Sequence, residues 1–391
     1  MIHSLLFDFD GLILDTETPD YTAWQEIYAE YGCSLSIHDW GQIIGGTGFA
    51  DFDAVSALEK QAGLALDHET LNARWRKRGD ELIAFQPVLP GVRDYLDAAR
   101  RLGLHLAIAS SSDHAWVDTH LKRLGLWDYF EAVLCSDDVR RTKPDPELFV
   151  KTMVALHSRP DEALVFEDSP NGVKAAKAAG IRVVAVPNAL TEQLAISGAD
   201  LILPSLAEFS LEDLLLRFNV TVRQELPADI PGIRLVNRSA FPQEAEANLV
   251  DMIRERGKVI LSLVAVNGDK VIGHVLFSPV MLHPDHGSLR GLGLGPVAVL
   301  PEAQGIGLGT RLIESGLEIC RRRGYDFVVL LGDPRYYSRF GFIPAAEFGL
   351  ENEYGVEEEF QARELRPGVL KGTRALVHYT PEFKRLVAEG D

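Results

Sequence analysis

Two carboxylates stand one residue apart at the end of an apolar run near the start of the chain. The run Ile2 to Phe7 predicts a buried strand, and Asp8, Asp10 and Gly11 follow it as a polar turn. Ligands of open α/β sheets bind beyond the carboxyl ends of the strands, where these acids are expected. Because an isolated Asp-x-Asp is more often a plain turn, the choice between a turn and a reactive site depends on the other strands.

Two later strands also end in polar residues that could serve one reaction. Residues 104–109 lead into Ser110, and residues 163–166 lead into Glu167 and Asp168. Two unit charges 4 Å apart repel by about 4 kcal/mol at an effective dielectric of 20, so gathered carboxylates need a positive charge among them. Hard oxygen ligands near a phosphate suit Mg²⁺, and Lys143 could add a fixed positive charge.

These residues together resemble the motifs of the haloacid dehalogenase (HAD) superfamily phosphatases, in the β-phosphoglucomutase and phosphoglycolate phosphatase branch. In chain order the motifs are Asp8-Phe9-Asp10-Gly11, Ser110, Lys143-Pro144 and Glu167-Asp168. The resemblance covers residues 1 to about 215. It implies a Rossmann-like parallel sheet with a helical cap, acting on a small phosphorylated metabolite. The alternation of strands with helices favours the same α/β class.

The resemblance also implies roles for the motif residues. Asp8 would attack phosphorus to form an aspartyl-phosphate, and Asp10 would protonate the leaving oxygen and then deprotonate water. Ser110 and Lys143 would bind the phosphoryl oxygens. The implied Mg²⁺ ligands are Asp8, Asp10 through its carbonyl, and Asp168, with Glu167 either a direct ligand or a supporting neighbour.

Residues 17–86 show helical spacing and correspond to the cap of this family, which closes over the active site. Two departures from the mutases occur there. Asp20 stands where the mutases have an acid/base histidine, and residues 45–49 contain no arginine. The sequence therefore favours phosphomonoester hydrolysis, with a sugar-phosphate mutase as an alternative.

The alternation of strand and helix stops after residue 218, and a new pattern begins near Ile233. Two apolar runs separated by Asn267-Gly268 predict a hairpin there. We therefore expect a separate α+β domain after a Pro-containing linker. The expected divisions are a core at 1–16 and 87–218, a cap at 17–86, a linker at 219–232 and a second domain at 233–391.

A glycine-rich loop, Gln304 to Thr310, lies between a predicted strand and a long amphipathic helix. Its bare backbone N–H groups at the positive end of a helix dipole favour a pyrophosphate. A Walker loop would need lysine where Gly309 stands, and the G-x-G-x-x-G of a dinucleotide fold is absent. The loop alone leaves the nucleotide open.

This part resembles the GNAT acetyltransferases, whose acetyl-CoA loop reads Gln/Arg-x-x-Gly-x-Gly/Ala. The resemblance spans about residues 233–385 and includes the ending Tyr336-Tyr337-Ser338-Arg339-Phe340-Gly341-Phe342. It implies that Val297 and Val299 offer backbone hydrogen bonds to the pantetheine arm, and that Tyr337 protonates the departing thiolate. A core tyrosine without a catalytic role is the alternative for Tyr337. The residues implied for the pyrophosphate are Gln304, Gly305, Gly307, Gly309 and Thr310.

Composition narrows the partners. A formal net charge of -18 disfavours nucleic acid and anionic membranes as partners. No run reaches the ~18 apolar residues of a membrane helix, and the N-terminus starts with a core strand, so we expect a cytoplasmic protein. Cys33, Cys135 and Cys320 form no C-x-x-C pair and predict neither disulfides nor a zinc site.

The main hypothesis is a bifunctional enzyme. It joins an Mg²⁺-dependent phosphatase to an acetyl-CoA-dependent N-acetyltransferase of a small-molecule amine. One alternative is a phosphatase regulated by a non-catalytic acetyl-CoA-binding domain. A purely binding scaffold is disfavoured because it has no need for both Asp8 and Asp10.

Overall fold

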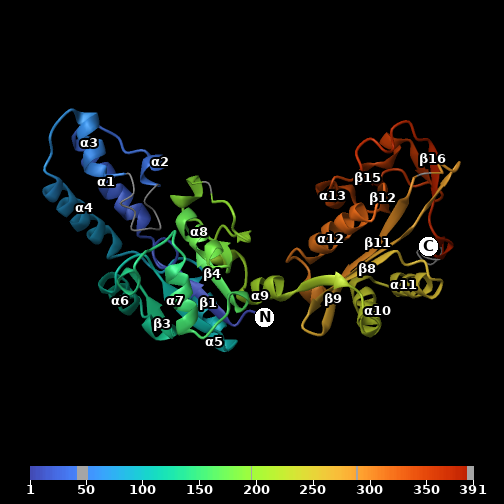
Figure 1. Cartoon of the computed structure of the whole chain (residues 1–391), viewed down its shortest axis with the longest axis horizontal. Coiled ribbons are helices and arrows are strands. Elements are labelled where there is room, and N and C mark those ends of the chain that lie inside the picture. Colours follow the sequence, from blue (N-terminus) through green and yellow to red (C-terminus); the bar gives the residue numbers. More distant parts are fainter. Residues whose placement is uncertain (42–51, 195, 288, 385–391) are drawn as a thin grey trace. The chain divides into compact units, whose positions relative to one another are not determined.

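The chain folds into two compact units, Met1–Leu215 and Leu216–Asp391 (Figure 1). The computed structural model describes residues 1–41, 52–194, 196–287 and 289–384. Among these residues, no helix combines the length and the apolar character needed to cross a bilayer. Each unit has its own sheet and is described separately below.

The first unit is built on a six-stranded sheet in which all neighbouring strands are parallel, in the order β3-β2-β1-β4-β5-β6. Its strands are β1 Ser4–Phe7, β2 His105–Ala109, β3 Ala132–Leu134, β4 Ala163–Glu167, β5 Arg182–Ala185 and β6 Leu201–Ile202. The predicted α/β class is confirmed. The two-residue strand β6 was not among the predicted strands, because its short run lies half exposed at the sheet edge.

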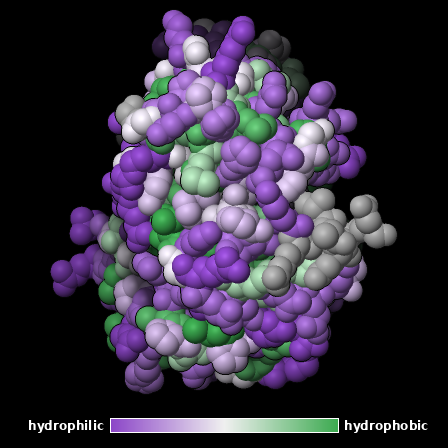
Figure 2. All heavy atoms as spheres, turned by 90° about the vertical axis from the view of Figure 1, so that its right-hand side faces the viewer, coloured by the Kyte–Doolittle hydropathy of each residue, from purple (hydrophilic) through white to green (hydrophobic). Residues whose placement is uncertain are grey.

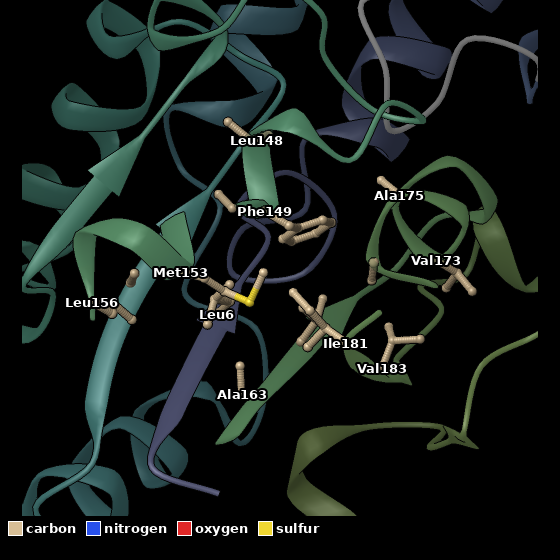
Figure 3. Close-up of a cluster of buried hydrophobic side chains, with 14 of the residues drawn as sticks. Leu6, Leu148, Phe149, Met153, Leu156, Ala163, Val173, Ala175, Ile181 and Val183 are labelled. Carbon is tan, nitrogen blue, oxygen red and sulfur yellow. The ribbon is translucent and has the colours of Figure 1, made fainter. Parts of the chain in front are cut away.

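Helices cover this sheet and bury an apolar core against it. They are α5 Val92–Arg101, α6 His114–Arg123, α7 Glu147–Ala155, α8 Pro170–Ala178 and α9 Leu211–Asn219. Figure 3 shows Phe149 and Met153 of α7 beside Leu6 of β1, with Ile181 and Val183 further along the same cluster. A central strand buried on both faces reads as a continuous apolar run, and Ser4–Phe7 is fully buried.

Two helices of the first unit begin at side-chain caps next to the strand ends. Ser169 caps α8 by accepting a hydrogen bond from the N–H of Gly172, and Pro170 occupies the first helical position. Asp113 caps α6 by accepting from the N–H of Trp116. These caps fix the loops that follow β4 and β2, which contain Asp168 and Ser110.

The predicted helical cap is present as α1 Glu17–Glu30, α2 Ile37–Trp40, α3 Ala54–Ala62 and α4 His68–Ile83. Its core is aromatic, since the rings of Trp24 and Trp75 stack at 5.6 Å and Trp40 meets Trp75 edge-on. Leu190 of the core domain packs into the same cluster. The sequence prediction about residues 45–49 falls outside the described residues.

The second unit contains a mixed seven-stranded sheet in the order β13-β15-β12-β11-β9-β8-β7. Its strands are β7 Thr221–Gln224, β8 Leu261–Asn267, β9 Lys270–Pro279, β11 Gly291–Val299, β12 Phe327–Leu331, β13 Ile343–Pro344 and β15 Phe360–Glu364. A smaller sheet holds β10 Met281–His283, β14 Leu350–Asn352 and β16 Ala375–His378. Asn267 pairs with Lys270, so the predicted hairpin is confirmed.

Helices of the second unit pack on both faces of its large sheet. They are α10 Ile230–Ala240, α11 Ala245–Glu255, α12 Leu308–Arg322 and α13 Pro334–Tyr337. On α12, a Cβ at Gly316 would lie 2.3 Å from the Phe277 ring, so glycine permits close packing on β9. The helix α10 packs on the other face (Figure 1), where Asn237 reaches His274 of the same strand. Figure 2 shows one side of the molecule with mostly hydrophilic side chains and small separate apolar patches.

Strands β11 and β12 are parallel neighbours that separate. Pairing runs from Gly291 with Phe327 to Gly293 with Val329 and stops there, while β11 continues to Val299. On its other edge β11 keeps pairing with β9 after a register shift between Leu294 and Val297. The second half of β11 therefore has one edge without a strand partner.

The predicted linker at 219–232 is not supported by the structure. Thr221–Gln224 forms β7, which pairs antiparallel with β8, and α10 starts at Ile230. The chain therefore joins the second sheet about a dozen residues before Ile233. Prolines at 227 and 231 suggested a linker, but each lies in the first turn of a helix, where a missing N–H costs no hydrogen bond.

A buried histidine lies between this sheet and α10. The fully buried ring of His274 contacts Ser262 Oγ at 3.0 Å and accepts from Asn237 Nδ2 at 3.1 Å. Burial, and after it the charge of Arg254, lowers the pKa of His274 to about 3. The ring is therefore neutral in the folded chain at neutral pH.

Acidification should destabilise the second unit through His274. Below pH 6.5 the His274 imidazole binds a proton in the unfolded chain, whereas in the folded chain it stays neutral down to about pH 3. The free energy of unfolding therefore falls by up to about 1.4 kcal/mol per pH unit as the pH is lowered through this range. In urea unfolding, the free energy of unfolding of His274→Gln should fall less between pH 6.5 and pH 5 than that of wild type. The exposed His283→Gln is the control, and equal slopes in wild type and His274→Gln would contradict the assignment.

Candidate active sites

Four predicted residues of the first unit meet at the carboxyl ends of β1 and β4. Lys143 is buried, and its Nζ lies 2.5 Å from Asp8 Oδ1 and 2.6 Å from Glu167 Oε1. Asp8, Glu167 and Asp168 each place a carboxylate oxygen within 4.8 Å of the others. Because β1 and β4 are neighbours in register, with Phe7 beside Phe166, the residues after them are brought together.

Glycines allow this crowding of acids. A Cβ at Gly172, in the first turn of α8, would lie 1.9 Å from the Glu167 carboxyl carbon. A Cβ at Gly11 would lie 2.1 Å from Asp168 Oδ2, and Gly11 also has a φ of +76°. Both positions therefore require glycine for the carboxylates to approach.

The electrostatics of this crevice leave negative charge uncompensated. Burial, and then the charge of Glu167, raise the pKa of Asp8 to about 8, although Lys143 opposes the shift. Burial, Asp8 and Glu167 likewise raise the pKa of Asp168 well above its usual value. Burial lowers the pKa of Lys143, but Asp8 and Glu167 more than offset this and raise it overall.

The donor set fits a divalent cation. Asp168 Oδ1 is buried and has no hydrogen-bond partner among the described residues, while its Oδ2 accepts from Asn188 Nδ2 at 2.8 Å. Carboxylate oxygens are the ligands that Mg²⁺ prefers. A cation held by Asp8 and Asp168 would supply the positive charge that the two raised pKa values indicate is missing.

Asp10 points to a different set of neighbours. Its carboxylate accepts from Thr16 Oγ1 at 3.0 Å, Ser112 Oγ at 2.7 Å and Trp116 Nε1 at 2.9 Å. Ser110 Oγ, predicted to bind phosphate, also donates to Asp10, at 3.2 Å. The Asp10 side chain is not in the cluster of Asp8, Glu167 and Asp168. A metal role for Asp10 would therefore require its backbone carbonyl.

Two more carboxyl groups lie on the first turn of α1, on the cap side of the crevice. Burial raises the pKa of Asp20 to about 7, with Asp10 as the next cause. Burial and then Asp20 also raise the pKa of Glu17 well above its usual value. A Cβ at Gly79 of α4 would lie 2.4 Å from Asp20 Oδ1, so α4 approaches this carboxyl group closely.

Four residues of the first site were not among the predicted ones. They are Thr16, Ser112, Trp116 and Asn188. Three of them hold Asp10, and Asn188 bridges Asp168 and the Gly11 carbonyl. Ser112 and Thr16 lie close in sequence to predicted site residues, and this proximity could have identified them. No sequence pattern indicates Asn188 or Trp116, because only the conformation of a loop and a helix brings them close to the acids.

The predicted acetyl-CoA loop of the second unit opens α12. Gly305 and Gly307 have φ values of +81° and +84°, and Gly307 is the N-cap of the helix. The first N–H groups of α12 lack partners within the helix. A cavity of about 390 Å³ is lined by Gln304, Gly305, Gly307, Gly309 and Thr310, together with Val297, Val299, Tyr337 and Arg339.

The open edge of β11 lies in the same cavity. Leu300 donates its N–H to Ile272 on the β9 side. Because peptide groups alternate along a strand, those of Val297 and Val299 face the edge that β12 has left. The carbonyl of Val299 accepts from Gln304 Nε2 at 3.0 Å, which ties the loop to the strand.

Tyr337 lies where this cavity meets a second one. It is half-buried, and burial followed by Tyr336 raises its pKa to about 12. Its ring packs against Gly332, where a Cβ would lie 2.4 Å from the ring. Tyr337, Val297 and Phe241 line both cavities. Phe241 and Arg339 were not predicted to line the site, although Arg339 lies in the middle of the Tyr336–Phe342 motif.

Comparisons with known proteins agree with the division of the chain into two units. Residues 5–186 match the haloacid dehalogenase-like hydrolase family, and residues 221–345 match the acetyltransferase (GNAT) domain family. The putative phosphatase YhcW of Bacillus subtilis is 46% identical over 220 residues, which are 56% of this chain and 99% of that protein. The phosphorylated carbohydrates phosphatase of Thermotoga maritima is 30% identical over 206 residues, 50% of this chain and 90% of that protein.

The second unit has relatives of its own. The uncharacterized N-acetyltransferase YhbS of Escherichia coli is 42% identical over 166 residues, which are 42% of this chain and 98% of that protein. A crystal structure of YhbS in complex with CoA is 40% identical, covers 43% of this chain and 93% of that chain, and has a TM-score of 0.41. The chain therefore belongs to the HAD-like hydrolases through its first unit and to the GNAT acetyltransferases through its second. The predicted membership of the HAD superfamily and of the GNAT family is confirmed.

Asp168 provides a test of the metal site that needs no activity. Without metal, Asp168→Asn should be as stable as wild type or more stable, because it removes a charge that the crevice disfavours. With Mg²⁺ at about 100 times its Kd, wild type should gain about 2.7 kcal/mol, and the variant should gain far less. Thermal unfolding with and without Mg²⁺ measures both, and the exposed Asp161→Asn is the control. If Mg²⁺ stabilised Asp168→Asn as much as Asp161→Asn, the metal assignment would be contradicted.

Proposed function

We propose that the chain is a bifunctional enzyme. Its first unit would be an Mg²⁺-dependent phosphomonoester hydrolase that forms an aspartyl-phosphate. Its second unit would transfer the acetyl group of acetyl-CoA to a small-molecule amine. The observation that carries the first activity is the buried Lys143 between Asp8 and Glu167, beside the unpartnered oxygen of Asp168.

In the first reaction, an Asp8 oxygen attacks phosphorus and the bond to the leaving oxygen breaks. Lys143 orients Asp8 and offsets charge on the phosphoryl oxygens. Asp10 gives a proton to the leaving oxygen and then takes one from the water that hydrolyses the acyl-phosphate. Mg²⁺ bound by Asp8 and Asp168 would offset the negative charge of the phosphate.

The position of the Asp10 carboxylate supports its proposed role in proton transfer, separate from the nucleophile Asp8. The Asp10 carboxylate is fixed by Thr16, Ser112 and Trp116 at the mouth of the crevice, apart from the buried acids. Movement of the Asp10 side chain would free the Ser110 hydroxyl, which now donates to Asp10 Oδ2, to donate to a phosphoryl oxygen. Asp20, in place of the mutase histidine, supports hydrolysis over sugar-phosphate transfer.

We infer that the phosphate substrate is a phosphorylated carbohydrate. The support is the 30% identity to the Thermotoga maritima phosphatase, whose name gives that substrate class. The cap helix α1 would select among such compounds, because Glu17 and Asp20 of its first turn lie on the cap side of the crevice.

In the second reaction, the ammonium of the acceptor first loses a proton to solvent, and the neutral nitrogen then attacks the thioester carbon. The C–N bond forms and the C–S bond breaks. Tyr337 gives a proton to the departing thiolate, and the raised pKa of its hydroxyl keeps that proton in place until then. The second proton that the nitrogen loses passes to solvent, from which the Tyr337 hydroxyl is reprotonated. The N–H groups at the start of α12 would hold the pyrophosphate, and the Val297 and Val299 peptides would pair with the pantetheine arm.

The phosphatase is tested by release of inorganic phosphate from a panel of phosphorylated carbohydrates with Mg²⁺. Asp8→Asn should lower the rate by about 1,000-fold or more, because the nucleophile is lost. EDTA should lower the wild-type rate comparably, and Asp161→Asn should match wild type. Wild type and Asp8→Asn that are equally inactive over the whole panel would refute the proposal.

The acetyltransferase is tested with Tyr337→Phe. Loss of the proton donor should lower acetyl transfer by about 100-fold, while stabilisation by CoA in thermal unfolding stays close to that of wild type. Tyr325→Phe, a tyrosine outside both cavities, is the control. If Tyr337→Phe retained the wild-type rate, Tyr337 would be a packing residue.

A further inference from the structure

A second cavity in the acetyltransferase unit adjoins the proposed acetyl-CoA cavity. It has a volume of about 230 Å³, below the roughly 300–1,000 Å³ of sites for drug-sized ligands. Phe241, Val297 and Tyr337 line both cavities. A thioester at the end of the pantetheine arm would reach this junction, and the smaller cavity lies beyond it.

The smaller cavity is aromatic and carries one carboxylate. The rings of Tyr354 and Tyr379 lie 6.0 Å apart and those of Tyr379 and Phe383 lie 5.2 Å apart. Among the described residues that line it, Glu246 is the one with a formal charge, and no lysine, arginine or histidine lines it. Aromatic faces and a carboxylate both attract a cation.

Glu246 has an unused oxygen. It lies in the first turn of α11, and its Oε2 is buried without a hydrogen-bond partner. In the described part of the chain, no basic side chain lies within the 4.0 Å of an ion pair with Glu246. The helix N-cap is Glu244, which pairs with Arg234 and Arg238, so Glu246 has no comparable structural partner.

A second polar atom in the cavity also lacks a partner. Tyr379 is 4% exposed, and its hydroxyl accepts or donates no hydrogen bond within the described structure. A buried hydroxyl left unpaired costs about 1–3 kcal/mol. A ligand that brings an ammonium to Glu246 and a polar atom to Tyr379 would satisfy both groups.

We propose that this cavity binds the acetyl acceptor, and that the acceptor is a small, unphosphorylated amine with an apolar or aromatic body, held through its ammonium by Glu246. The inference rests on the proposed acetyltransferase function. A phosphate in the cavity would meet Glu246 without any cation to offset the two charges, and burying unpaired charge is strongly unfavourable.

This assignment orders the two activities if one metabolite passes through both. A compound with an amine and a phosphate would have to lose its phosphate before it could enter the acceptor cavity. The hydrolase reaction would then supply the acceptor, and the acetyltransferase would consume it. A phosphorylated amine would not itself be acetylated.

The test compares matched amines in the full chain carrying Asp8→Asn, so that no phosphate is removed during the assay. The probes are tyramine and phenethylamine, and the pairs ethanolamine with phosphoethanolamine and glucosamine with glucosamine 6-phosphate. The unphosphorylated member of each pair should have the higher kcat/KM for acetylation, by about 100-fold. Adding Glu246→Gln should lower kcat/KM for the amines by about tenfold or more, mainly through KM, with the KM for acetyl-CoA unchanged.

Glu255→Gln, an exposed residue at the end of the same helix, is the matched control and should behave as the Asp8→Asn background. Preference for the phosphorylated members, unchanged kinetics in Glu246→Gln, or acetylation confined to a lysine-containing peptide would each overturn the acceptor assignment. If no amine is acetylated although CoA stabilises the chain, the proposed acetyltransferase function fails. Amine binding to the CoA-loaded chain by calorimetry then decides the cavity assignment, and loss of that binding in Glu246→Gln sustains it.

Discussion

The buried ammonium of Lys143 is the interaction on which the first unit depends. One positive charge lies among Asp8, Glu167 and Asp168, and glycines allow two of these acids, Glu167 and Asp168, to approach. A chain that folded with these acids unpaired would lose several kcal/mol per buried charge. The parallel sheet makes the arrangement possible, because neighbouring strands deliver their carboxyl ends to one edge.

The two proposed activities would bind anions by different means, and neither would rely on the charge of the whole protein. The net charge of -18 repels phosphate at long range. The first unit would bind a phosphate through a buried lysine and a cluster of oxygen ligands suited to a divalent cation. The second would bind a pyrophosphate through backbone N–H groups at the start of α12. In both proposed sites, local geometry would set the anion affinity.

The sequence made much of both folds and sites predictable. Asp8 and Asp168 directly follow buried strands, Lys143 stands before Pro144 in a recognisable motif, and the loop before α12 carries its glycines at a recognisable spacing. Trp116 and Asn188 were beyond reach, since their approach to the acids depends on loop conformation. The acceptor cavity was hidden for a similar reason: Glu246, Tyr354 and Tyr379 come from separate segments, and each alone is an ordinary residue. The strand β7 was missed because two prolines in helix first turns suggested a linker.

The parting of β11 from β12 after Gly293 and Val329 has a kinetic consequence. In the proposed acetyltransferase, donor and acceptor would meet at Tyr337, which lines both cavities. Among the described residues that line these cavities, there is no cysteine. The acetyl group would then pass directly from sulfur to nitrogen while both substrates are bound, and the initial-rate plots of such an enzyme would intersect instead of running parallel.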